Sequence, residues 1–216
     1  MVFYAKIMKF TKLIYFGSLL VLLAGIGCGG RQSRVEHGNQ NQILHYGNGA
    51  EPQDLDPQIV TGVPEHHIII SLLEGLVTPD PKTLEPRPGV AESWKVSDNQ
   101  LTYTFNLRKN AKWSNGDSVT AHDFVKSYQR ILTPSLAAEY SYMLHVMKNA
   151  EAFNTGKITD FSQVGVKALD DHTLQIQLEA PTPYFLHLLN HYSWFPVHIP
   201  TVEKHGPVYE RGNRWT

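Results

Sequence analysis

The stretch TYTFNLRKNAKWSNGDSVTAHDFVKSYQRI, residues 102–131, contains the clearest structural pattern in this chain. Apolar and polar residues alternate over residues 101–107, a period typical of a strand with one buried face. The apolar residues of this alternation are Leu101, Tyr103, Phe105 and Leu107. The strand ends before Arg108, and Asn115-Gly116, shortly after Trp113, is a strong tight-turn pair. We therefore expect a hairpin to follow the strand.

A capped helix is predicted directly after this hairpin. Thr120 and Asp123 have the spacing of a capping box, and Val119 with Phe124 can form a hydrophobic staple. Apolar residues then recur at helical spacing up to Pro134, namely Phe124, Val125, Tyr128, Ile131 and Leu132. The whole stretch thus predicts a packing unit of strand, hairpin and helix.

Two further elements are expected on the C-terminal side. Leu174, Ile176 and Leu178 alternate with polar residues after an Asp170-Asp171 turn, which predicts a second strand beside residues 101–107 in one sheet. A second helix is expected to begin at Pro183, to be capped by Thr182, and to run through Leu189. Strands mixed with helices, without regular βαβ alternation, predict a mixed α/β fold built of α+β lobes.

Composition and motifs exclude several classes of function. The chain has 19 basic and 20 acidic side chains and no basic run, which argues against nucleic acid as a partner. It contains no GxSxG, no GxxxxGK[ST], no HExxH and no GxGxxG after a strand. Because no nucleophile is indicated, we expect a protein that is not an enzyme.

The histidines do not predict a metal site. His187 and His191 lie four residues apart on the predicted second helix, but no acid stands between them. His66 and His67 are adjacent, so their side chains diverge in either a strand or a helix. We therefore expect neither a metal nor a cofactor.

Three aspartates could in principle serve as the acids of a glycosidase pair. Asp54, Asp56 and Asp80 lie in turn-rich stretches beside prolines, where Asp commonly caps backbone N–H groups. We therefore interpret these three carboxylates as structural rather than catalytic.

The N-terminal residues resemble an export signal. Lys6, Lys9 and Lys12 precede an almost uninterrupted apolar segment, residues 13–27, and the sole cysteine, Cys28, follows it. Residues 1–28 are interpreted as a lipoprotein signal peptide in which Cys28 is lipidated. A membrane-spanning anchor and an incidental thiol remain the alternatives. Residues 29–42 are polar and are expected to form a flexible tether.

Several stretches resemble one family. EPQDLDP (51–57), LLEGLVTPDP with PGVAESW (72–81 and 88–94) and residues 102–131 are similar, in order and spacing, to the N-terminal part of the extracellular solute-binding proteins, family 5, of peptide and nickel ABC importers. GVKALDDHTLQIQLEAPTPYF (165–185) and VEKHGPVYERGNRWT (202–216) resemble the oligopeptide-binding branch, the OppA type. The resemblance covers nearly all of residues 43–216.

The resemblance implies a two-lobed, periplasmic-binding-protein-like receptor that closes on its ligand. Residues 43–73 would be the first segment of the main lobe, residues 74–198 a small additional lobe, and residues 199–216 a return to the main lobe. Family members are more than twice as long, so we expect the chain to be an N-terminal portion, a fragment that exposes apolar surface, dissolves poorly and binds weakly or not at all by itself.

The resemblance also implies site residues. In oligopeptide-binding members the peptide lies extended and pairs with receptor backbone, and the matching segment here is Thr61, Gly62 and Val63. Relatives often carry an acid where this chain has Thr61. Tyr140 matches a tyrosine that contacts peptide. A scaffold role is expected for Arg108, Trp113, Gly116 and Asp123.

The implied function is capture of extracellular oligopeptides by a lipid-anchored receptor. Its partners would be the oligopeptide, an ABC permease of the cytoplasmic membrane and the bilayer that holds Cys28. The protein would lie at the outer face of the cell membrane or in the periplasm. The same family with another cargo (dipeptide, nickel chelate), a non-functional membrane-associated remnant, and a lipid-anchored hydrolase are the alternatives.

Overall fold

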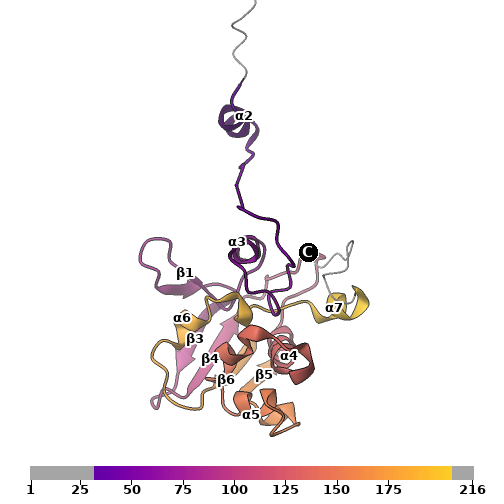
Figure 1. Ribbon diagram of the computed structural model, residues 1–216. Coiled ribbons are helices and arrows are strands. Elements are labelled where there is room, and N and C mark those ends of the chain that lie inside the picture. The colour runs from indigo at the N-terminus through magenta and orange to yellow at the C-terminus, as the bar shows by residue number, and fades with distance from the viewer. Residues whose placement is uncertain (1–31, 206–216) are drawn as a thin grey trace, which may run out of the picture. The chain divides into compact units, whose positions relative to one another are not determined.

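The computed structural model describes residues 32–205, and contacts divide the chain into two compact units, residues 1–47 and 48–216. Figure 1 shows the elements in chain order. The predicted signal peptide with Cys28, the start of the predicted tether and the stretch from 206 to 216 lie outside the described residues.

The helices are α2 (Arg34–Asn41), α3 (Val63–Leu72), α4 (Ala121–Leu132), α5 (Ala150–Asn154), α6 (Phe185–Leu188) and α7 (Ile199–His205). The strands are β1 (Val77–Pro79), β2 (Pro86–Pro88), β3 (Ala91–Val96), β4 (Thr102–Leu107), β5 (Val166–Asp170) and β6 (Thr173–Gln177). The short 3₁₀ helices are η1 (Pro134–Leu136), η2 (Glu139–Leu144), η3 (Phe161–Gln163) and η4 (Tyr192–Trp194).

The centre of the second unit is an antiparallel sheet in the order β3-β4-β6-β5. The two predicted strands, β4 and β6, are its central strands and are neighbours, with Phe105 opposite Leu174. This confirms the prediction from alternation. β3 and β5 form the sheet edges, and most of their residues are at least partly exposed, so neither shows the alternation that identified the central strands.

Helix α4 covers one side of the sheet, where it contacts β5 and β6 (Figure 1). Its predicted capping is present, since the Asp123 carboxylate accepts hydrogen bonds from the Thr120 N–H at 2.7 Å and from the Thr120 hydroxyl at 3.0 Å. Phe124, Tyr128, Ile131 and Leu132 are buried, as the helical spacing predicted. The helix therefore contributes one continuous apolar face to the core.

The predicted hairpin is a short one. Lys112 and Ser118 form an antiparallel bridge, and Gly116 adopts a φ of +94°, a left-handed conformation that favours glycine. The Trp113 N–H donates to the Asp117 carbonyl at 2.9 Å. A tight turn therefore joins β4 to α4, as expected.

The second predicted helix is only partly correct. Helix α6 has a single turn, begins after Tyr184, and ends at Leu188. Thr182 does not cap it, because its hydroxyl donates to the Ala180 carbonyl at 3.0 Å. His191 consequently lies outside α6, before η4, so the expectation that His187 and His191 share one helix is wrong.

Two apolar clusters hold residues 48–205 of the second unit together. The larger one lies between the sheet and α4, and there Trp194 packs edge-on against Tyr128 and Phe185. The smaller one joins Val60, Ile69, Tyr192 and Phe195. Because residues near 60 and near 195 meet in it, the smaller cluster fixes the start of this unit to its end.

Helix α3 carries apolar side chains on all sides. Only Glu65 and Ile69 are buried, whereas Val63, Ile70 and Leu72 are 66%, 45% and 56% exposed. Within residues 32–205, no helix is long and apolar enough to cross a membrane. The exposed face of α3 agrees with the expectation of uncovered apolar surface, while poor solubility stays a prediction.

The predicted tether contains an ordered element. Residues 34–41 form α2, which begins with a capping box between Ser33 and Glu36. This helix was not expected, because its residues are polar and show no apolar periodicity. The local capping bonds, rather than a buried face, account for its start.

Candidate functional site

The predicted backbone segment leads into the N-terminus of α3. Thr61 is exposed, Gly62 is the N-cap with extended φ and ψ of −85° and 155°, and Val63 is the first helical residue. The Gly62 carbonyl accepts from the His66 N–H at 3.1 Å, as the first bond of the helix. The extended backbone therefore ends at Gly62, and Val63 offers one of the N–H groups that a helix start leaves without an intrahelical partner.

A buried carboxylate explains why position 62 has no side chain. A Cβ atom on Gly62 would lie 1.9 Å from Oε2 of Glu65. Glu65 is 4% exposed, and its Oε1 accepts from the Gln53 N–H at 2.7 Å. Glycine at this position therefore makes room for the Glu65 side chain.

Tyr140 and Thr61 lie side by side although 79 residues separate them. Tyr140 is part of η2, and its hydroxyl donates to the Thr61 carbonyl at 3.4 Å. The structure thus brings together two of the predicted site residues that come from different parts of the chain. Their role in binding stays a prediction.

Three aromatic residues that the sequence did not nominate complete this site. Tyr192 donates from its hydroxyl to the Val60 carbonyl at 3.1 Å. Its ring stacks on His191 at 4.3 Å between centroids and lies 5.6 Å from His66. His191 also meets the ring of Tyr140 edge-on at 5.0 Å. We call this set the Thr61–Tyr140 cluster; it comprises Val60, Thr61, Gly62, His66, Tyr140, His191 and Tyr192.

The histidines of this cluster stand out in the sequence, but sequence spacing connects them to other histidines than the structure does. Sequence spacing groups His66 with His67 and His191 with His187, as pairs that could share a metal ion. In the structure His66 and His191 converge on Tyr192, whereas His187 lies 3.6 Å from a carboxylate oxygen of Glu85. No group of three or more His, Cys, Asp or Glu side chains within residues 32–205 has the geometry to hold a metal ion.

The cluster carries no net charge at neutral pH on its imidazoles. Burial, followed by the neighbouring His66, lowers the pKa of His191 to about 4. Burial and then His67 lower the pKa of His66. Burial, together with Tyr140, raises the pKa of Tyr192. The partly exposed imidazoles of His66 and His191 are therefore uncharged, and the carbonyl groups of Val60 and Thr61 are bonded to the hydroxyls of Tyr192 and Tyr140.

A separate cavity of about 320 Å³ lies beside the hairpin. Arg108 and Trp113 line it together with Leu72 and His198. Arg108 forms an ion pair with Glu74, and the rings of Trp113 and His198 lie 5.4 Å apart. Arg108 and Trp113 thus contact other residues that line the cavity, and their scaffold role stays a prediction. No residue of the Thr61–Tyr140 cluster lines this cavity.

The aspartates do not form a catalytic pair. Asp54 accepts from the N–H groups of Leu55 and Asp56, and Asp80 from those of Lys82 and Thr83. Asp56 accepts from the Gln58 N–H and from Arg130. Backbone capping and two ion pairs, Asp56 with Arg130 and Asp80 with Arg87, therefore account for all three carboxylates, as the turn context predicted.

Comparison with known families gives a match over most of the second unit. The sequence profile of the bacterial extracellular solute-binding proteins, family 5 Middle, matches residues 85–214. This range includes Tyr140, His191 and Tyr192 but begins after Thr61.

Curated relatives extend the match. The periplasmic oligopeptide-binding protein OppA of Salmonella typhimurium is 45% identical over 177 residues, which is 81% of this chain and 31% of the relative. The periplasmic murein peptide-binding protein MppA of Escherichia coli is 44% identical over 168 residues, 77% of this chain and 29% of the relative. The chain thus spans about a third of the length of these relatives.

A solved structure confirms the fold class. The crystal structure of Haemophilus influenzae OppA in complex with the peptide RPPGFSPFR superposes with a TM-score of 0.70 at 45% identity. The superposition covers 74% of this chain and 31% of that protein. The mixed helix and sheet architecture described above is therefore that of part of a periplasmic binding protein.

Proposed function

Since this chain belongs to family 5 of the bacterial extracellular solute-binding proteins, we propose that it serves in capturing oligopeptides outside the cytoplasmic membrane for an ABC importer. The Thr61–Tyr140 cluster would form one side of the peptide site. The contact between the Tyr140 hydroxyl and the Thr61 carbonyl carries this proposal, because it places the predicted backbone segment and the predicted side chain at one location.

The cluster suits recognition of an extended main chain. Thr61 is exposed and Gly62 has extended backbone, so this edge is available for pairing with a peptide strand. Such pairing gives affinity with little dependence on side chains. The partly exposed rings of His66, Tyr140 and His191 beside it add stacking surface without selecting for charge, whereas Tyr192 is buried and supports them.

Binding and release, without covalent chemistry, are the whole of the proposed activity. Solute-binding proteins of this kind act by closing two lobes around a ligand, a hinge motion. The cluster contains no nucleophile paired with a base. The protein is accordingly proposed to be a receptor and not an enzyme.

Anchoring at the membrane is the second part of the proposal. Cys28 follows the apolar segment at residues 13–27, and its lipidation would hold the chain at the outer face of the membrane. The relatives named above are periplasmic proteins. An ABC permease in the same membrane would be the partner that receives the peptide.

Calorimetry on a chimera tests the peptide proposal. In this chimera, residues 43–205 of this chain replace the matching region of Salmonella typhimurium OppA, so the site is completed by a protein named for oligopeptide binding. We expect the chimera to bind a tripeptide or a nonapeptide, and to bind neither a dipeptide nor a nickel chelate with comparable affinity. If the chimera bound only the dipeptide or only the nickel chelate, that compound would instead be favoured as the cargo.

A matched pair of tyrosine variants links this binding to the cluster. Tyr140→Ala is expected to weaken peptide binding about tenfold, equivalent to ~1.4 kcal/mol, because it removes both a ring and a hydroxyl from the site. Tyr184→Ala removes a 58% exposed tyrosine outside the cluster and is expected to leave affinity unchanged. Equal effects of the two variants would contradict the proposed site.

A further inference from the structure

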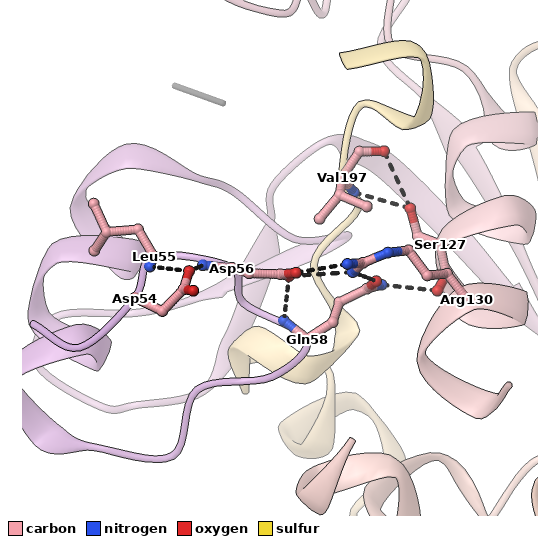
Figure 2. A network of polar contacts seen from close by, with 7 residues as sticks. All are labelled: Asp54, Leu55, Asp56, Gln58, Ser127, Arg130 and Val197. Carbon is pink, nitrogen blue, oxygen red and sulfur yellow. Dashed lines mark hydrogen bonds and ion pairs between the residues drawn. The ribbon is translucent and has the colours of Figure 1, made fainter. Parts of the chain in front are cut away.

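A buried ion pair lies at the start of the segment that reaches Thr61. The Asp56 side chain is 1% exposed and the Arg130 side chain 18% exposed. Arg130 donates from Nη2 to Asp56 Oδ2 at 2.7 Å and from Nη1 to Asp56 Oδ1 at 3.2 Å (Figure 2). Two parallel bonds between a guanidinium and a carboxylate fix direction as well as distance.

The same guanidinium also holds Gln58. Nη1 of Arg130 donates to Oε1 of Gln58, and Nε2 of Gln58 donates to the Ser127 carbonyl at 2.7 Å (Figure 2). The Gln58 N–H in turn donates to Asp56 Oδ1 at 3.0 Å. Residues 56 and 58 are thereby attached to Ser127 and Arg130, which lie about one turn apart on α4.

The network reaches a second, distant segment through Ser127. The Ser127 hydroxyl donates to the Val197 carbonyl at 3.3 Å and accepts from the Val197 N–H at 2.9 Å (Figure 2). Tyr128, on the same helix, donates to the Trp194 carbonyl at 3.2 Å. Helix α4 therefore fixes both the segment before Thr61 and the segment after Tyr192.

Backbone bonds continue from the ion pair to the Thr61–Tyr140 cluster. The N–H groups of Ile59 and Val60 both donate to the Asp56 carbonyl, each at 3.2 Å. The Val60 carbonyl then accepts from Tyr192, and the Thr61 carbonyl from Tyr140. A continuous path of hydrogen bonds and backbone therefore connects Asp56 to the carbonyl groups of residues 60 and 61.

We propose that Arg130 and Asp56 are a positioning pair, which sets where the backbone of residues 59–62 stands relative to Tyr140 and Tyr192. The inference rests on the proposed function in that this backbone is one side of the peptide site. Neither side chain of the pair contacts the ligand. They act through the backbone that they hold.

The chemistry of the pair favours positioning over bulk stability. A buried ion pair is often no more stabilising than a well-packed apolar replacement, so stability alone does not explain it. The guanidinium meets three acceptor oxygens at fixed angles, which an ammonium group on a flexible stem does not reproduce. Arg130→Lys is therefore the decisive variant, because it keeps the positive charge and removes the planar guanidinium that makes the parallel hydrogen bonds.

Hydrogen exchange on the full chain, followed by mass spectrometry of peptic fragments, tests the inference without a ligand. We expect Arg130→Lys to accelerate exchange about tenfold in fragments covering residues 53–66, and to leave β4 within about twofold of the parent chain. The matched control is Arg87→Lys, which alters the exposed ion pair between Arg87 and Asp80 and is expected to change neither region.

Asp56→Asn is the second variant, because it keeps the size of the side chain and one acceptor oxygen for Arg130. It is expected to give the same local pattern to a smaller extent. Unchanged exchange over residues 53–66 in both variants, or equal acceleration in those residues and in β4, would overturn the positioning role.

The peptide measurement separates this inference from the proposed function. In the chimera described above, Arg130→Lys is expected to weaken peptide binding about tenfold, although the residue does not touch the peptide. A chimera that binds no peptide would contradict the proposed function, whereas the exchange experiment would still decide whether the pair positions residues 59–62. Local acceleration of exchange with undiminished peptide affinity would refute the link between the pair and the site.

Discussion

Gly62 offers a sharp test of the site geometry, because its missing side chain makes room for a buried carboxylate. In Gly62→Ala, a Cβ placed 1.9 Å from Glu65 Oε2 forces that carboxylate to move. Moving it breaks the 2.7 Å bond from the Gln53 N–H to Glu65 Oε1. Hydrogen bonds to charged groups contribute about 1.5–3 kcal/mol, so we expect Gly62→Ala to lower the free energy of unfolding by about 2–3 kcal/mol.

A double-mutant cycle isolates the cause. Once Glu65→Ala has removed the carboxylate, Gly62→Ala has nothing to displace, and only the smaller preference for glycine over alanine at an N-cap remains, below about 1 kcal/mol. Urea denaturation of the parent, the two single variants and the double variant measures the coupling. If Gly62→Ala has the same cost in both backgrounds, the clash with Glu65 is not the reason for the glycine.

Three further predictions concern pH, the core and the N-terminus. Because the pKa of His191 is about 4 in the folded chain, below its ordinary value of 6.5, the unfolded chain binds a proton there first, and the free energy of unfolding should fall as the pH drops from 6.5 towards 4. His191→Asn keeps a capping acceptor for the Ser193 N–H and should flatten this decline in the Tm measured against pH; an unchanged slope would show that His191 is not its source. Phe105→Ala at the centre of β4 should cost about 3–5 kcal/mol in urea denaturation, and a loss below about 1 kcal/mol would contradict its place in the core. Cys28→Ser should release the protein from sedimented membranes, whereas continued sedimentation would count against lipidation as the anchor.

The central strands and helix α4 could be predicted because their patterns are local. Burial of every second residue in β4 and β6, and of one face in α4, leaves a periodicity that can be seen in the sequence itself. Edge strands such as β3 lack that periodicity, because residues on both of its faces are exposed and a bulge between Ala91 and Ser93 interrupts the register. The edge strands β3 and β5 form because they pair with the central strands β4 and β6.

Helix α6 was overestimated for a related reason. Phe185 and Leu189 are buried at helical spacing, yet the chain leaves the helix after Leu188 so that Tyr192 and Trp194 can enter two different apolar clusters. Tertiary packing therefore overrides the local preference. Helix α2 shows the opposite case, in which capping bonds alone define a helix that has no apolar face.

The candidate site could be predicted only at the residues that the family resemblance supplied. Thr61 and Tyr140 were expected on that basis, and the structure places them in contact. His66, His191 and Tyr192 were not connected to them, because no sequence spacing links residues that meet only through folding. The positioning pair Asp56 and Arg130 likewise has no local signature, since 74 residues separate its members.

Photo-cross-linking of a bound peptide to the chimera tests the central claim most directly. The peptide carries a benzophenone side chain, and the residues it reaches are identified by mass spectrometry. We predict cross-links within residues 59–67 and at Tyr140 or its neighbours, all lost on competition with unlabelled peptide. Competed cross-links confined to the cavity beside Trp113, with none at the Thr61–Tyr140 cluster, would contradict the account.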